Sequence, residues 1–173
     1  MKLSERYSPA PTTRVLGIDF GTRRVGAAVS DPRRVIATPL EVYERRDPSR
    51  DAAHYLAIVR EHDVDRIVIG LPLHSNGGES DSSAQARRWG AWLAGVTALP
   101  VFFYDERYTT VDADDVLRSA GIKLKDRKAR RDMLAARILL QNYLDDGCPE
   151  GEPPATPLAD APEAGPDPAD DGG

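Results

Sequence analysis

The chain has 173 residues, a formal net charge of −5 at pH 7 and a single cysteine, Cys148. This length is sufficient for one hydrophobic core of ordinary size. No apolar run approaches the length of a transmembrane helix, and residues 1–13 lack the apolar segment of a signal peptide. A lone cysteine excludes an intramolecular disulfide and a zinc cluster of thiolates. We therefore expect a cytoplasmic protein with no membrane partner.

The negative charge is concentrated at the C-terminal end. Residues 148–173 contain seven acidic residues, no Lys or Arg, and seven of the fourteen prolines. The preceding 147 residues hold the other 21 acids and all 23 bases, a net charge of +2. We predict a flexible N-terminal segment (1–13), one folded domain (14–147) and a disordered acidic tail (148–173), because the tail has too few apolar residues to offset the entropy lost on ordering.

The first part of the folded domain predicts a meander of three strands. Strands are predicted at residues 14–19 and 24–30, and the segment 21–23 between them is short enough for a hairpin. A third strand is predicted at residues 40–44, after a loop that contains Asp31-Pro32 and Thr38-Pro39. Strands joined by such short connections are antiparallel.

Helices and strands alternate in the rest of the domain. Asp47-Pro48 are typical N-cap and first-turn residues of a helix, and its predicted apolar stripe is Ala52, Leu56 and Val59, with Tyr55 beside it. Residues 67–70 are an all-apolar strand of the kind that is buried on both faces. A loop over residues 71–80, a helix to about residue 94 and a strand at residues 101–105 follow.

The C-terminal part of the domain is predicted to be helical. One helix covers residues 109–120 and is ended by Gly121. A basic segment, residues 123–131, precedes or opens a last helix that runs to residue 145. Because strands reached through a helix are parallel to their neighbours, the whole order predicts an α/β fold, a ribonuclease-H-like five-stranded mixed sheet flanked by helices.

Acidic residues stand at three places in the chain where the fold itself needs none. Asp19 ends an apolar strand, and burial of an unpaired charge is costly. Asp105 and Glu106 end the last strand, and since neighbouring residues of a strand point to opposite faces, spacing alone leaves either as the candidate. Asp132 heads a helical stripe that continues through Ala136 and Tyr143. We expect these carboxylates to converge at the edge of the sheet where parallel strands end.

Three oxygen donors favour Mg²⁺ or Mn²⁺ over zinc, and paired ions of this kind hydrolyse phosphodiesters. Each acid also has a structural alternative. Asp19 could cap a turn, Asp105 or Glu106 could pair with Arg107, and Asp132 could be an acid favoured by the helix dipole.

Basic residues near these acids predict contacts to a nucleic-acid backbone. The basic segment carries positive charge where a helix dipole disfavours it, although an ordinary solvated run would look the same. Its members are Lys123, Lys125, Arg127, Lys128, Arg130 and Arg131. Arg23, Arg24 and Arg107 could add phosphate contacts, as could His74 in the loop after the fourth strand. Trp89 and Trp92 are more consistent with a core than with a base-stacking platform.

Taken in order, four segments resemble the YqgF-type family of bacterial Holliday-junction-resolvase-like nucleases, also described as pre-16S ribosomal RNA nucleases. They are residues 16–26 (LGIDFGTRRVG), 67–73 (IVIGLPL), 105–110 (DERYTT) and 132–144 (DMLAA leading into ILLQNYL). The resemblance favours Glu106 over Asp105 and implies the acidic trio Asp19, Glu106 and Asp132. Tyr108, where an aliphatic residue is common, and the loop around His74 depart from the pattern, and the tail lies outside it.

The expected function is metal-dependent hydrolysis of structured RNA or branched DNA, and specifically processing of the 5′ end of pre-16S rRNA. One alternative is a Holliday junction resolvase, which needs two matched active sites and hence a dimer. Another is a nucleic-acid-binding module without catalysis. An actin-like ATPase would need a second domain and a second glycine-rich phosphate loop. Because the sequence has no obvious dimer seam, we expect a monomer or weak homodimer.

Overall fold

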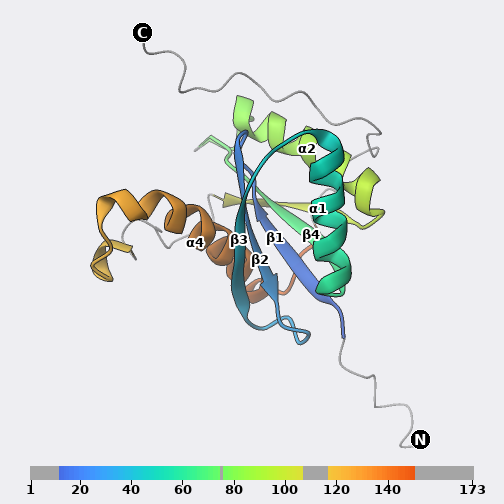
Figure 1. Cartoon of the computed structure of the whole chain (residues 1–173), viewed down its shortest axis with the longest axis horizontal. Helices are drawn as coiled ribbons and strands as arrows, with labels where there is room; N and C mark the ends of the chain where they lie inside the picture. The colour runs from blue at the N-terminus through green and yellow to red at the C-terminus, as the bar shows by residue number, and fades with distance from the viewer. Residues whose placement is uncertain (1–11, 75, 107–116, 151–173) are drawn as a thin grey trace, which may run out of the picture.

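The computed structural model describes residues 12–74, 76–106 and 117–150, and of residues 124–129 it describes the backbone only. A five-stranded sheet forms its centre, in the order β3-β2-β1-β4-β5 (Figure 1). The strands are β1 (Arg14–Asp19), β2 (Arg24–Ser30), β3 (Ala37–Glu44), β4 (Val64–Leu71) and β5 (Val101–Asp105). The first three are antiparallel, and β1, β4 and β5 are parallel. The predicted ribonuclease-H-like mixed sheet is therefore confirmed.

Two strands begin three residues earlier than the sequence predicts. The start of β3 was misplaced because Thr38-Pro39 is typical of a loop. However, β3 is an edge strand, where a proline is tolerated. Ala37 is fixed in the strand by a distant residue, since its N–H donates to Oε1 of Gln141 at 3.0 Å. In β4, Val64 is buried and the strand extends on both sides of the predicted apolar run.

Helices cover both faces of the sheet. Helices α1 (Pro48–Glu61) and α2 (Asp81–Thr97) lie on one face, and α4 (Leu124–Asp145) lies on the other (Figure 1). Asp47 caps α1 as predicted, because its side chain accepts from the N–H of Arg50. None of the described helices combines the length and apolarity needed to cross a bilayer.

The predicted apolar stripe of α1 is confirmed only in part, because Ala52 and Val59 pack against the core but the centre of the buried face lies elsewhere. Tyr55 and Ile58 are its buried apolar residues, whereas Leu56 is only half-buried. The helix is turned because the Tyr55 ring packs edge-on against Trp89 of α2, with centroids 5.3 Å apart. The other tryptophan, Trp92, is also buried, so both belong to the core, as expected.

Alternate residues of each strand point to two separate cores. Leu16 and Ile18 of β1 and Ile67 and Ile69 of β4 face α1 and α2. The α4 face carries the alternate residues of these strands, such as Val15 and Val68, and also Tyr104 of β5. This alternation decides which acidic side chains meet beyond the strand ends.

Only glycine fits at two strand positions beneath α4. A Cβ on Gly17 would lie 2.6 Å from Cβ of Leu140, and one on Gly26 would lie 2.4 Å from the carbonyl oxygen of Asp132. The helix backbone therefore rests almost directly on β1 and β2, which brings its side chains within reach of the strand ends.

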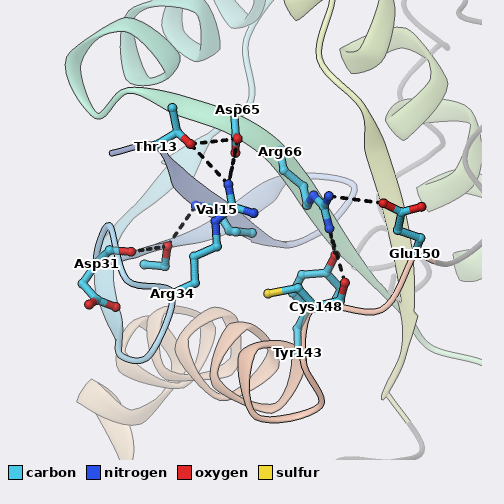
Figure 2. A network of polar contacts seen from close by, with 10 residues as sticks. Thr13, Val15, Asp31, Arg34, Asp65, Arg66, Tyr143, Cys148 and Glu150 are labelled. Atoms are coloured by element: carbon cyan, nitrogen blue, oxygen red, sulfur yellow. Dashed lines mark hydrogen bonds and ion pairs between the residues drawn. The ribbon is translucent and has the colours of Figure 1, made fainter. Parts of the chain in front are cut away.

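The C-terminal end of α4 is held by Arg66, near the start of β4 and away from the ends of the parallel strands (Figure 2). The guanidinium of Arg66 donates to the hydroxyl of Tyr143 and to the carbonyl of Cys148, both at 3.3 Å. It also lies 3.5 Å from Oε1 of Glu150 and 4.9 Å from the ring centroid of Phe102. These contacts continue beyond residue 147, so we propose that the folded part ends at about Glu150.

Two truncations test this boundary. Deletion of residues 151–173 should leave the free energy of unfolding nearly unchanged. Deletion of residues 148–173 removes the hydrogen bond at Cys148 and the ion pair at Glu150, and should cost about 1 to 2 kcal/mol. Chemical denaturation of both proteins would measure the difference. Equal stability of the two would place the boundary before residue 148.

Candidate active site

Asp19 and Glu106 meet at the end of the sheet where the parallel strands end. Asp19 is the last residue of β1, and Glu106 directly follows β5. Their carboxyl groups hydrogen-bond to each other. Gly70 of the intervening strand β4 leaves room for this contact, since a Cβ there would lie 2.2 Å from Oε1 of Glu106. The pair thus depends on residues from three strands.

Strand alternation explains why Glu106, and not Asp105, contacts Asp19. Tyr104 of β5 lies in the core beneath α4, as Val15 of β1 does. Residues two positions further along a strand point to the same face, so Glu106 points to the face occupied by Asp19. Asp105, the last residue of β5, alternates to the opposite face.

Burial strongly perturbs this pair of acids. It raises the pKa of Asp19 to about 8, and the charges of Glu106 and Asp132 add to the effect. Burial also raises the pKa of Glu106, although its hydrogen bond with Asp19 opposes that rise. Two carboxyl groups in contact titrate together. Without a cation beside them, they retain a proton near neutral pH.

Asp132 lies next to this pair, on α4. Its backbone carbonyl lies over Gly26, the residue that pairs with Asp19 across the β1–β2 ladder. Its carboxylate is 4.0 Å from Nε of Arg24, and each of the two side chains is about one-third exposed. The predicted helix face is present, because Ala136 and Tyr143 are buried and Asp132 heads their stripe.

The three acids do not form one compact ligand cluster. Within residues 12–74, 76–106 and 117–150, no three His, Cys, Asp or Glu side chains lie close enough together to hold one metal ion. Asp19 and Glu106 form a pair, and Asp132 acts on Asp19 through its charge. The oxygen-only donor set nevertheless fits Mg²⁺ or Mn²⁺, and a divalent cation would stabilise the ionised form that burial disfavours.

The predicted phosphate-binding residues lie on different elements, and one of them, Arg24, contacts a site acid. Arg23 is exposed in the β1–β2 turn, and Arg24 opens β2 beside Asp132. Lys123 is the exposed N-cap of α4, and Arg130 and Arg131 are exposed on the helix.

The structure describes fewer of the atoms of the remaining predicted residues. Lys125, Arg127 and Lys128 lie in the first two turns of α4, whose side chains are outside the described part, and Arg107 lies outside it altogether. The basic segment therefore opens the last helix, whose N-terminal part projects beyond the sheet (Figure 1). His74 is exposed in the loop between β4 and α2.

Two residues important for this geometry, Gly26 and Gly70, received no role from the sequence. A glycine in the interior of a predicted strand is a signal for close approach of another group. Both lie on the α4 face near the strand ends, but the sequence does not indicate which group approaches them.

The sheet order, the helices on both faces and the acids at the strand ends define a ribonuclease-H-like α/β protein with a carboxylate site. Comparison with known sequences makes this more specific. The sequence profile of the RuvX family, described as Holliday junction resolvases, matches residues 13–146, and the chain belongs to this family.

Several relatives match most of this chain. Proteins named "Putative pre-16S rRNA nuclease" from Rhodopirellula baltica and Koribacter versatilis are 40% and 41% identical, over 78% and 76% of this chain and 78% and 86% of their own. A protein of the same name from Agathobacter rectalis is 41% identical over 76% of this chain and 94% of its own.

A solved structure is similar in a more distant way. Thermus thermophilus RuvC in complex with a Holliday junction substrate has a TM-score of 0.48 and 19% identity. The match covers 82% of this chain and 99% of that protein.

Proposed function

We propose that this chain is a metal-dependent endonuclease that hydrolyses phosphodiester bonds of structured nucleic acid. The observation that carries the proposal is the contact between the half-buried carboxyl groups of Asp19 and Glu106. Such a pair costs stability when it is ionised alone, and strongly perturbed acids are typical of functional sites. Membership of the RuvX family supports the same reaction class.

In this proposal Asp19 and Glu106 would hold Mg²⁺ or Mn²⁺ directly, and Asp132 would move closer to complete the site when the ion binds, since the three do not form one cluster in the described structure. A bound divalent ion lowers the pKa of a water molecule and stabilises charge on the phosphate. The protein's own side chains orient the substrate. Arg24 is placed to contact a phosphate beside Asp132, from which it lies 4.0 Å away. Arg23, Arg107 and the basic segment would bind the backbone on either side.

We infer that the substrate is the 5′ end of pre-16S rRNA. The name carried by relatives of about 40% identity supports this choice. The description of the family favours a second candidate, resolution of four-way DNA junctions. That reaction takes two active sites, most simply in a two-fold dimer. Trp89 and Trp92, the large aromatic residues of α2, are buried in the core and cannot form a dimer seam, so we propose a monomer or weak dimer in the cytoplasm.

The test compares two substrates under the same conditions. Purified protein is offered a 16S precursor end and a synthetic four-way junction, with Mg²⁺, with Mn²⁺ and with a chelator. Its mass in solution is measured in parallel, and Asp19→Asn serves as the inactive control. Metal-dependent cleavage of the RNA by a monomer supports the proposal. A dimer that makes paired cuts in the junction and ignores the RNA would establish the second candidate, and binding without cleavage the inert module.

The basic segment should contribute affinity without sequence preference. Replacing Lys125, Lys128 and Arg131 with Gln should weaken binding to all substrates and flatten the dependence of affinity on salt, by roughly one unit of slope for each phosphate that is no longer neutralised. Binding titrations at several salt concentrations measure both quantities.

A second triple variant controls for net charge. It replaces Arg33, Arg60 and Arg88, which are exposed and lie outside the basic segment. Its salt dependence should remain that of the wild type. If both triple variants behave alike, the basic segment acts only through the total charge of the protein.

A further inference from the structure

Arg45, the first residue after β3, has a buried guanidinium next to the candidate active site. Its side chain is only 11% exposed and that of its ion-pair partner Asp51 only 4%. Burial of two charges is expensive, and such pairs are often no more stabilising than apolar residues of similar size. Stability therefore does not by itself explain this pair.

The side chain of Arg45 holds the turn that connects Asp19 to Arg24. Its Nη1 donates to the carbonyl of Thr22 at 2.9 Å, and its guanidinium lies 5.5 Å from the ring centroid of Phe20. The backbone N–H of Arg45 also donates to the carbonyl of Arg23 at 2.9 Å. Arg45 thus contacts three of the four residues in this turn.

The guanidinium is itself fixed by α1. Asp51, in the first turn of that helix, places Oδ2 at 3.9 Å from Nε of Arg45. Its Oδ1 accepts from the hydroxyl of Tyr43 and from the N–H of Arg46, both at 2.9 Å. Besides Arg45, the Phe20 ring contacts Trp89, and the two ring centroids are 5.2 Å apart. Asp51 therefore fixes the position of the Arg45 side chain, and this side chain holds the turn over residues 20–23.

The turn has little freedom to move independently of its ends. A Cβ on Gly21 would lie 2.3 Å from the carbonyl oxygen of Arg24, so the two backbones are in close contact. Asp19 precedes this turn and Arg24 follows it. A displacement of the turn would therefore move the carboxylate that contacts Glu106 and the guanidinium that faces Asp132 together.

We propose that Arg45 is a positioning residue, which holds the turn over residues 20–23 so that Asp19 and Arg24 keep the separation that phosphodiester cleavage requires. This role rests on the proposed nuclease function. Arg45 acts through the turn and does not touch the substrate. Its planar guanidinium can donate to Thr22 and stack on Phe20 at the same time, which a lysine cannot do.

The test uses Arg45→Met and Arg45→Lys with two controls. Ile58→Val mildly destabilises the core beside α1, because Ile58 is 5% exposed. Arg50→Met removes an exposed arginine whose Nε lies 3.2 Å from Asp47. The measurements are kcat and KM at saturating Mg²⁺, well below every melting temperature, and hydrogen exchange of the amides of residues 20–24.

For Arg45→Met we expect kcat to fall by about tenfold to a hundredfold with KM changed by less than about threefold, together with faster exchange confined to the turn. Arg45→Lys should be intermediate, and both controls should keep wild-type values. A wild-type kcat and wild-type exchange in Arg45→Met would overturn the proposal, as would an equal loss in Ile58→Val. If the wild-type protein cleaves nothing with any metal, the nuclease function has failed. Exchange at the turn then still decides whether Arg45 positions it.

Discussion

Replacing Asp19 with Asn should abolish cleavage and, at the same time, stabilise the protein in the absence of metal. The loss of activity should be about two to three orders of magnitude or more, since a ligand that stabilises charge in the transition state is removed. The gain in stability follows because Asn removes a half-buried carboxyl group whose ionised form is disfavoured by desolvation and by the charge of Glu106. Glu106→Gln and Asp132→Asn should also be nearly inactive with the fold intact.

The gain in stability should depend on pH in a defined direction. The pKa of Asp19 rises from 3.8 to about 8 on folding. An acid with a raised pKa binds its proton more tightly in the folded state, so it costs nothing at low pH, and its cost grows as the pH rises from about 4 to about 8. Asn has no such cost. The difference in melting temperature between Asp19→Asn and wild type should therefore increase from pH 5 to pH 8 in a chelating buffer.

Thermal denaturation measures this difference, with about 2 to 4 °C expected per kcal/mol for a chain of this size. The control is Glu44→Gln, an exposed acid at the end of β3. Its melting temperature should follow the wild type at every pH. A variant Asp19→Asn that is less stable than wild type at pH 8 would mean that the ionised carboxylate stabilises the fold, and that the acidic pair is structural.

Much of the fold could be predicted from local patterns. The limits of β1, β2 and β5 and the N-cap of α1 follow from apolar runs, a short turn and Asp47-Pro48. The antiparallel and parallel directions of the strands then follow from the lengths of the connections, but the position of β4 beside β1 does not. The errors concern contacts between distant residues. Gln141 binds Ala37 across 104 positions, and Trp89 sets the orientation of α1 through Tyr55.

The sequence singles out the acids of the candidate site but does not give their geometry. Asp19 was conspicuous because a buried strand has no use for a carboxylate. Spacing alone leaves Asp105 and Glu106 as alternatives, and only the resemblance favours Glu106. The physical reason, that α4 covers the face of Tyr104, is found only in the packed structure. Arg45 received no role from its local sequence, since the residues that explain it, Thr22 and Phe20, belong to another segment of the chain.

The second large effect is expected when a side chain is added at Gly26 or at Gly70. Both are buried glycines on the same face of the sheet, and each would bring a Cβ within 2.4 Å of a neighbouring atom. They differ in what that atom is. At Gly26 it is the backbone carbonyl of Asp132, whereas at Gly70 it is the carboxylate oxygen at the flexible end of Glu106.

Gly26→Ala should therefore damage both stability and activity, and Gly70→Ala mainly activity. The first must push the backbone of α4 away from the sheet, which costs about 1 to 3 kcal/mol, as overpacking of a core does. The second displaces only a side chain, so the free energy of unfolding should change by less than about 1 kcal/mol. Since misplacement of a catalytic group by about 1 Å can cost a hundredfold in rate, cleavage should fall by about that factor in both variants. Denaturation and cleavage assays on the matched pair measure the two effects. An active Gly70→Ala protein would show that Glu106 need not occupy the position beside Asp19 for the reaction.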